Sequence, residues 1–574
     1  MVPTLASTGL ILALLLICTN GQLLFPANEV TQLTFGPTTT LVNTSLRGVP
    51  WSELRAPRIA IIGAGAGGTS AAYFLSLLNQ TQNNFDLKTK VTLFEKQTYV
   101  GGRSFPIKPW LDDPIHYNHN DDDDDEPVEC GASIFVEANK NINKAVRLFN
   151  LTLKQHSNEQ GVMAIWNGQQ FVFQESNSRG WGYWDIAKML WRYGRAPLRI
   201  KNLVTKTVKD FTSVYSSEFA SKGPFDSIQD FAESINLLEP CSMVANDYFD
   251  KYTTSSSQLF VNEIVGAATA VNYAQSVHNI HAVGALVSMA ANGASAVKGG
   301  NRRVFENFLS KSQAHVKLGE TVKSITKLDA AQGKRPQFVV KTSGNGGGTF
   351  DAVIFAAPFH QTGIELVGFK QSVQNRIPHQ EYIQLHVTFV ITNATTPLPE
   401  YFGLKQGTTV PKTIFTTYDT QTSRQQNKPE FNSLNYLQTL SDQTKEKFFN
   451  NVTGTLHVVK MFSMHPIMNN EKGQILLNNL FGPSNLIKVW STSFLSYPKL
   501  DPVQMNSKTN GDQNLQQWKS NFSSIRPDES VYYVNSFERL ISTMETETVS
   551  SWNIVSLLLQ DFFAFKPNSS WVEG

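Results

Sequence analysis

The sequence predicts an α/β fold, and three observations in its first hundred residues carry that prediction. Residues 59–62 are apolar without alternation, as in a strand that is buried on both faces of a parallel sheet. A glycine-rich turn and a helix of small and apolar residues over 69–78 follow. A second apolar strand over 91–94 completes the order of strand, turn, helix and strand, which is typical of a nucleotide-binding unit.

The glycine turn has the spacing of a dinucleotide-binding motif. It reads Gly63-Ala64-Gly65-Ala66-Gly67-Gly68 and fits G-x-G-x-x-G. In this Rossmann-like motif the first glycine makes the tight turn, the second lets the backbone approach a pyrophosphate, and the third allows the helix to pack on the strand. The second strand ends at Glu95, whose carboxylate would hold a ribose hydroxyl. We therefore predict dinucleotide binding in preference to a purely structural glycine turn.

The separation between this motif and Glu95 exceeds the ~20 residues that are usual. The excess is the polar segment 79–90. We expect this segment to be a surface loop inserted after the helix, which leaves the predicted site undisturbed.

The length and composition of the chain allow more than one large core. The 574 residues are 41% hydrophobic and 11% aromatic, and the net charge of +2 gives no reason to expect a nucleic-acid partner. Residues 161–175 alternate around a WNG turn and predict a hairpin, and residues 255–289 predict a helical stretch. A further buried strand is predicted within 350–358, and alternating stretches after residue 366 predict antiparallel strands. We predict a discontinuous dinucleotide-binding domain from 56–138, 290–365 and 525–574, and a second, α+β substrate domain from 139–289 and 366–524, with the ligand between them.

The N-terminal end predicts entry into the secretory pathway. Residues 9–18 read GLILALLLIC, an apolar run that is too short to span a bilayer and that small and polar residues follow up to Gln22. This pattern predicts a signal peptide over 1–22, although no basic residue precedes the run. Seven N-x-S/T sequons agree with a secretory route and are the expected glycosylation sites: Asn43, Asn79, Asn150, Asn393, Asn451, Asn521 and Asn568.

Three features allow two interpretations each. Cys130 and Cys241 either form a disulfide or remain two buried thiols, and no cysteine spacing suggests zinc, haem or a redox pair. The aspartate run 121–125 is expected to be a solvated loop rather than a calcium site. Residues 181–204 combine tryptophans and tyrosines with basic side chains. We expect a core helix with a solvated basic face there, and the alternative is a helix that rests on a membrane surface.

With these motifs in hand, the chain resembles the prenylcysteine oxidase (prenylcysteine lyase) family within the flavin-dependent amine oxidase superfamily. The resemblance runs from about residue 57 to residue 565. GAGAGG, FEK-x4-GGR and ECGAS indicate the superfamily, and the first of them is shared by many flavoproteins. Five further stretches, in combination, are more specific for the prenylcysteine oxidase family: 190–194 (LWRYG), 273–276 (YAQS), 297–301 (VKGGN), 351–358 and 542–545 (STME).

The resemblance implies FAD as the cofactor and assigns residues to it. The stretch Cys130-Gly131-Ala132 departs modestly from the family, which has a glycine before the second small residue there. The implied positions are Gly63, Gly65, Gly67 and Gly68 at the FAD diphosphate, Glu95 and the adjacent Lys96 at the adenosine ribose, Gly102 and Arg103 along the cofactor, Ala132 and Ser133 near the flavin, the backbone of Val322 at the adenine, and Glu545 and Thr546 in the last segment on the flavin side.

The implied activity is oxidation of the thioether of farnesyl- or geranylgeranyl-cysteine by oxygen, during the degradation of prenylated proteins. The products would be cysteine, a prenyl aldehyde and hydrogen peroxide. Because the cofactor carries the difficult step, the protein has to supply orientation and an apolar pocket. No catalytic base is predicted; His278 and His281 are candidates for handling a proton, but a structural role is favoured for both.

Two alternatives remain on the same scaffold. One is a secreted amine or amino-acid oxidase, and the other is a non-catalytic prenyl-lipid carrier without flavin. The intact glycine motif, Glu95 and the signal peptide argue against the carrier. A lysosome, a vacuole or the extracellular space is the expected destination, and the sequence gives no indication of oligomeric state.

Overall fold

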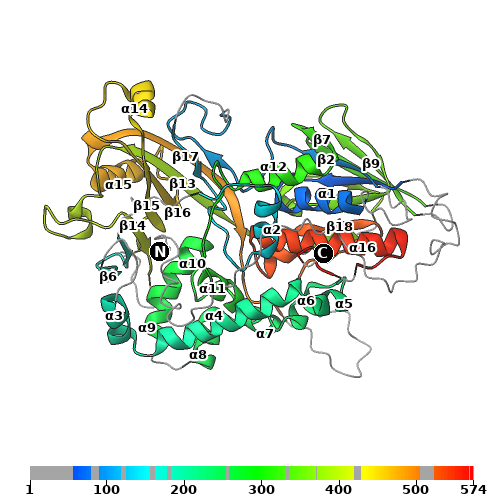
Figure 1. The fold of residues 1–574 in the computed structure, drawn as a ribbon, viewed down its shortest axis with the longest axis horizontal. Helices are drawn as coiled ribbons and strands as arrows, with labels where there is room; N and C mark the ends of the chain where they lie inside the picture. The colour runs from blue at the N-terminus through cyan, green and yellow to red at the C-terminus, as the bar shows by residue number, and fades with distance from the viewer. Residues whose placement is uncertain are drawn as a thin grey trace.

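In the computed structural model of the protein, two large β-sheets lie at opposite ends of the long axis (Figure 1). Helices lie against each sheet, and helix α4 (Ala196–Thr212) runs beneath the centre of the molecule in this view. The structure describes residues 56–78, 89–117, 124–154, 162–176, 183–253, 257–291, 293–330, 335–369, 372–418, 428–504, 522–567 and 569–572.

The first large sheet is five-stranded and parallel, as the sequence predicts. Its strand order is β18-β11-β1-β2-β7, and all four pairings are parallel. The strands are β1 (Arg58–Ile62), β2 (Lys90–Glu95), β7 (His315–Leu318), β11 (Ala352–Phe355) and β18 (Val531–Tyr533).

Strand β1 explains why its residues are apolar without alternation. Ile59 and Ile61 point into the core shared with helices α1 (Ala66–Leu78), α12 (Arg302–Lys311) and α16 (Met544–Phe563). Ala60 and Ile62 point to the opposite face, because successive side chains of a strand alternate. That face is covered by a four-stranded sheet of β10 (Gly348–Phe350), β9 (Gln337–Thr342), β8 (Val322–Leu328) and β12 (Glu365–Val367).

The second large sheet has seven strands in the order β17-β13-β16-β15-β14-β5-β6. All pairings are antiparallel except the one between β14 and β5. The hairpin predicted within 161–175 is confirmed as β5 and β6. The bounds are β5 (Met163–Trp166), β6 (Phe171–Gln174), β13 (Tyr382–Thr392), β14 (Thr413–Thr416), β15 (Ser433–Thr439), β16 (His457–Ser463) and β17 (Leu486–Pro498).

Helices from the middle of the chain pack on this sheet and on α16. The helical stretch expected over 255–289 is interrupted, because a π-turn over Val261–Val265 and a loop containing Ala274 at φ +53° divide it. The helices are α2 (Lys140–Leu148), α3 (Tyr183–Tyr193), α5 (Ser217–Lys222), α6 (Ile228–Ser234), α7 (Leu238–Cys241), α8 (Ala245–Tyr252), α9 (Gln258–Phe260), α10 (Gly266–Asn272), α11 (Ala282–Ser288), α13 (Ser372–Arg376), α14 (Asp442–Phe449) and α15 (Glu471–Phe481).

The prediction of one core helix over 181–204 is wrong. Helix α3 ends before Gly194, which has φ +58°, and α4 begins afterwards. Met189 and Tyr193 are buried, but Trp184 is 75% exposed and Trp191 is 90% exposed. The aromatic side chains of α3 therefore divide between the core and the solvent.

Other expectations meet the structure only in part. Cys130 and Cys241 are free and buried, which agrees with two separate thiols. Among the residues that the structure describes, no helix combines the length and apolar character needed to cross a membrane. The strands of the parallel sheet come from separate stretches of the chain, but the predicted domain boundaries remain predictions. The signal peptide, Asn43, Asn79, Asn521, Asn568, Trp181 and residues 121–123 lie outside the described residues.

Candidate active site

Two glycines of the motif are required by the packing of the loop itself. Gly63 has φ +111°, and a Cβ there would lie 2.4 Å from the carbonyl oxygen of Ala356, just after β11. A Cβ on Gly68 would lie 1.9 Å from the carbonyl oxygen of Gly63. Both positions exclude any larger side chain, as the motif predicts for a tight turn and close helix packing.

Gly65 differs from Gly63 and Gly68, because the space that a side chain at this position would occupy is empty. The nearest atom to a Cβ on Gly65 would be the Cα of Gly102, at 3.9 Å. Gly102 is exposed at φ +58°, and the neighbouring Gly101 N–H donates to the Ala64 carbonyl at 2.8 Å. Two bare backbone segments thus face one space at the N-terminus of α1, where the first-turn N–H groups have no intrahelical partner. This cradle fits a diphosphate group.

Gly67 lies on the other side of α1 from that cradle. A Cβ on Gly67 would lie 2.6 Å from Cγ1 of Val534 and 2.9 Å from Oε2 of Glu547. Gly67 therefore permits the close packing of α1 on α16. Its predicted contact with the diphosphate remains a prediction.

Glu95 holds the glycine loop from the end of β2. Its Oε2 accepts a hydrogen bond from the Ala64 N–H at 2.8 Å, and its Oε1 accepts one from the Gln97 N–H at 2.8 Å. The Glu95 carbonyl accepts the Glu320 N–H at 2.9 Å, which brings the start of β8 and Val322 alongside. Lys96 is exposed next to this carboxylate. The positions predicted for the adenosine end of the cofactor are therefore adjacent in space.

The Arg103 guanidinium links β17 of the seven-stranded sheet to the helical turn that follows β18. It pairs with the buried carboxylate of Glu538 and donates to the Ser496 carbonyl at 2.9 Å. Glu538 also accepts from the Tyr382 hydroxyl at 2.6 Å and from Asn535 at 2.8 Å. The sequence predicted a cofactor contact for Arg103, whereas its charged group is engaged with protein partners.

A second carboxyl, Glu547, lies beside this ion pair. Burial opposes ionisation of Glu538, but the Arg103 guanidinium and the hydrogen bonds hold the pKa of Glu538 below its usual value. Burial and the charge of Glu538 raise the pKa of Glu547 well above its ordinary range. Both effects favour the protonated form of Glu547, which lies next to Gly67 in the packing of α1 on α16.

The segment 129–133 is held by two residues that the sequence did not single out. Asn301 donates from its side chain to the Ala132 carbonyl at 2.8 Å and from its backbone to the Glu129 carboxylate at 2.6 Å. Lys460 Nζ donates to the Glu129 carbonyl at 2.6 Å and to the Ser133 hydroxyl at 3.0 Å. Together they fix Ala132 at φ +51° and orient Ser133.

Two groups of this cluster titrate close to neutral pH. Burial raises the pKa of Glu129 to about 7, and its second carboxylate oxygen has no hydrogen-bond partner within the described part of the chain. Burial lowers the pKa of Lys460 to about 8. Such shifts are typical of functional sites. A sequence pattern could have pointed to Lys460, because it is a single lysine within the strand His457–Ser463, which is buried at every position.

The start of α16 is capped by its own residues. Thr543 and Thr546 form a capping box, so the Thr546 side chain is used within the helix. The Glu545 carboxylate accepts from the Asn141 and Ile142 N–H groups at 2.8 and 3.0 Å, and from the Tyr215 hydroxyl at 2.5 Å. The side chains of Glu545 and Thr546 therefore stabilise helix ends. A contact of these two residues with the cofactor, as predicted, would have to come from their backbone atoms.

An aromatic surface borders these segments. A Cβ on Gly131 would lie 3.1 Å from Cζ of the Phe494 ring. The rings of Tyr273 and Tyr497 are 5.4 Å apart and edge to face, and the Tyr273 hydroxyl reaches the Ser542 carbonyl at 3.4 Å. Phe494 and Tyr497 of β17 thus lie, with Tyr273 from the loop after α10, beside the positions predicted to approach the flavin.

His281 has the structural role that the sequence favoured. It is fully buried, its Nδ1 accepts the Gly284 N–H at 3.1 Å at the start of α11, and its Nε2 bonds to the Arg539 carbonyl at 3.0 Å. Burial lowers the pKa of His281 to about 4, so it stays neutral at physiological pH. His278 is half-buried and bonds through its backbone to Ser276.

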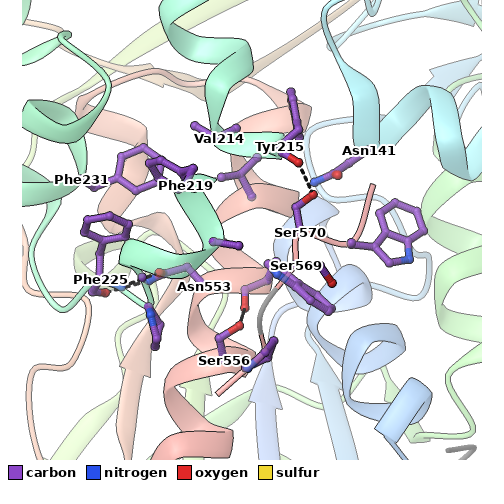
Figure 2. A pocket seen from close by; sticks show the side chains of 17 residues that line it. Asn141, Val214, Tyr215, Phe219, Phe225, Phe231, Asn553, Ser556, Ser569 and Ser570 are labelled. Atoms are coloured by element: carbon purple, nitrogen blue, oxygen red, sulfur yellow. Dashed lines mark hydrogen bonds between the residues drawn. The ribbon is translucent and has the colours of Figure 1, made fainter. Parts of the chain in front are cut away.

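A pocket lies away from the predicted site, between α16, the segment around α5 and the C-terminal residues (Figure 2). Phe219, Phe225 and Phe231 line it, and the Asn553 side chain bonds to the backbone of Phe225. None of the residues assigned to the cofactor contributes to its wall. The pocket and the predicted dinucleotide site are therefore different places.

The parallel sheet and the cradle define a protein with a Rossmann-like dinucleotide-binding domain. A model of NAD(P)-binding Rossmann-like domains matches residues 61–150. Among solved structures, the fold is similar to putrescine oxidase with bound putrescine, at 12% identity and a TM-score of 0.51, covering 88% of this chain and 99% of that one. That similarity concerns the fold alone.

The chain belongs to the prenylcysteine lyase family, whose model matches residues 174–569. It is 26% identical to farnesylcysteine lyase of Arabidopsis thaliana, over 89% of this chain and 90% of the relative. It is 27% identical to prenylcysteine oxidase 1 of Homo sapiens, over 88% of this chain and 90% of the relative. The resemblance stated from the motifs is confirmed.

Proposed function

We propose that this protein is an FAD-dependent oxidase that cleaves the thioether of farnesyl- or geranylgeranyl-cysteine. The observation that carries the proposal is that the motifs on which the resemblance rests meet in space. Asn301 of VKGGN holds Ala132 of ECGAS, and Tyr273 of YAQS reaches Ser542 at the start of the STME stretch. The names of the relatives, farnesylcysteine lyase and prenylcysteine oxidase 1, give the substrate class.

The net reaction consumes oxygen and water. The C–S bond and one C–H bond break at the prenyl carbon next to sulfur. Water supplies the aldehyde oxygen, one of its protons goes to the cysteine sulfur, and oxygen takes up two electrons and two protons to become hydrogen peroxide. FAD, when bound, supplies the hydride acceptor and the site of oxygen reduction.

The residues of the chain bind and orient the reactants. Gly65, Gly102 and the first-turn N–H groups of α1 would hold the diphosphate, and Glu95 would hold the ribose. The half-buried rings of Phe494 and Tyr497 offer apolar surface for a prenyl chain, whose burial contributes about 25 cal/mol per Å². Lys460 has a positioning role because it holds Ser133 and the Glu129 backbone.

The proposed route is the secretory pathway, to a lysosome, a vacuole or the outside of the cell. The signal-peptide pattern over 1–22 and the sequons support it. Asn150 and Asn451 are exposed, while Asn393 is half-buried. The raised pKa of Glu129 favours the folded state in an acidic compartment, where this carboxyl is neutral.

The proposal is tested with purified protein. It should be yellow, and farnesylcysteine added without oxygen should bleach the flavin, with colour and peroxide appearing when air is admitted. S-methylcysteine lacks the apolar chain and should bleach it far more slowly. Lipid binding without bleaching would instead indicate a carrier, and release of ammonia would indicate an amino-acid oxidase.

A further inference from the structure

Helix α3 presents two tryptophans to the solvent on one face. Trp184 is 75% exposed and Trp191 is 90% exposed. They are seven residues apart, which places them about 10 Å apart along the helix and within ~20° of the same direction around it. Lys188 lies between them and is also exposed. We call Trp184, Lys188 and Trp191 the tryptophan face.

Helix α3 does not need these two rings to pack on the core. The opposite side of the helix buries Asp185, Met189 and Tyr193, so α3 is already anchored on the core. Leu190 and Leu198 are also exposed, at 42% and 51%. Four of the thirteen large apolar side chains that are exposed among the described residues lie within 184–198, which makes this a patch rather than scattered surface.

The charge around the tryptophan face has one dominant sign. Residues 183–212 contain seven basic residues and two acidic ones, whereas the whole chain has a net charge of only +2. Arg192 is neutralised by two hydrogen bonds to Glu263, at 2.8 and 2.5 Å. Lys188 pairs with the buried Asp185 carboxylate at 3.3 Å and donates to the Ser176 hydroxyl at 2.8 Å, but half of its side chain remains exposed. Arg195 is exposed just beyond the end of α3.

This combination fits a lipid surface better than a protein partner. The centre of a protein interface is depleted of charged residues, but here Lys188 lies between the two indoles. Indole rings favour the boundary between headgroups and acyl chains, and basic residues beside them attract anionic headgroups. The two indole rings also project from the surface of α3 instead of lining a groove.

We propose that the tryptophan face docks this protein on membranes that contain anionic lipids. Trp184 and Trp191 enter the interfacial layer, and Lys188 and Arg195 contact the headgroups. The docking is peripheral and reversible, because one short helix with two aromatic side chains supplies limited buried area. It does not depend on the proposed activity.

The test measures sedimentation of the full protein with vesicles in about 0.1 M salt, where surface charges still act over roughly 10 Å. Vesicles of equal parts phosphatidylcholine and phosphatidylserine should bind the protein at least about tenfold more than vesicles of phosphatidylcholine alone, since each basic residue near an anionic surface contributes about 1 kcal/mol. Brominated phosphatidylserine vesicles should quench tryptophan emission of the wild type.

Variants then locate the contact. Trp184→Ala with Trp191→Ala should lower binding at least about tenfold and remove most of the quenching. Arg195→Glu should weaken binding to the anionic vesicles alone. Ile475→Ala is the matched control, because Ile475 is 52% exposed on α15. This control should bind as the wild type does, and circular dichroism should show that all variants are folded.

Three results would overturn the proposal. One is equal, weak sedimentation of the wild type with both kinds of vesicle. Another is unchanged binding by the double tryptophan variant. The third is a concentration-dependent dimer in light scattering that the double variant abolishes, since the tryptophan face would then be an interface between two copies of the chain.

Discussion

Gly65 and Gly68 belong to one motif, but the structure predicts opposite consequences for replacing them. The side of Gly65 is open, because the atom nearest to the position of a Cβ there is 3.9 Å away, whereas a Cβ on Gly68 would overlap the Gly63 carbonyl oxygen at 1.9 Å. Gly65→Val should therefore abolish cofactor binding and leave the cofactor-free protein folded. Gly68→Ala should destabilise the fold itself.

The expected magnitudes follow from these distances. A valine on Gly65 would fill the space between Gly65 and Gly102. Losing two charge-assisted hydrogen bonds to a diphosphate, at about 1.5–3 kcal/mol each, would weaken FAD binding by roughly 10²- to 10⁴-fold. Without FAD, the stability of Gly65→Val should stay within about 1 kcal/mol of the wild type. Overpacking in Gly68→Ala should cost about 1–3 kcal/mol or more.

Both quantities can be measured on the same preparations. Visible absorbance gives the ratio of flavin to protein, and urea unfolding of the flavin-free forms gives stability without the contribution of bound FAD. Full flavin occupancy in Gly65→Val would refute the cradle. Wild-type unfolding of Gly68→Ala would refute the packing argument.

Three further predictions concern other parts of the molecule. Arg103→Met should cost about 3–5 kcal/mol in urea unfolding, because it leaves the buried Glu538 carboxylate without its counter-ion, and a loss below about 1 kcal/mol would contradict this. Glu129 has a folded pKa of about 7 against an ordinary 4.5, so its stabilising contribution is complete below pH 4.5 and is lost as pH rises through 7, by at most about 3 kcal/mol. Glu129→Gln should flatten that pH dependence, and a profile like the wild type's would show that another group titrates. Protein from a eukaryotic host should lose apparent mass on endoglycosidase treatment, less so when Asn150 and Asn451 are replaced by glutamine, and an unchanged mass would contradict a secretory route.

The sequence predicted those parts of the fold that local patterns encode. The buried strand at 59–62, the glycine turn and the strand ending at Glu95 are contiguous, so their spacing alone indicates the parallel sheet and the dinucleotide loop. The hairpin of β5 and β6 was visible for the same reason.

The residues that were missed act across long separations in sequence. Lys460 reaches the Glu129 carbonyl from 331 positions away, and the Glu545 carboxylate accepts the Asn141 N–H from 404 positions away. No local pattern shows that Glu545 is engaged with α2, so the family assignment alone directed its side chain to the cofactor. The core-helix prediction for α3 failed because aromatic residues occur on both of its faces, and composition does not show which face is buried.

The most direct test of the central claim is the isotope dependence of anaerobic flavin bleaching. Farnesylcysteine with deuterium on the prenyl carbon attached to sulfur should bleach the flavin more slowly than the unlabelled compound, because that C–H bond breaks in the hydride step. Deuterium on the cysteine α-carbon should leave the rate unchanged. The reverse pattern with release of ammonia, or no bleaching by either prenylcysteine, would contradict the assignment of this chain as a prenylcysteine oxidase.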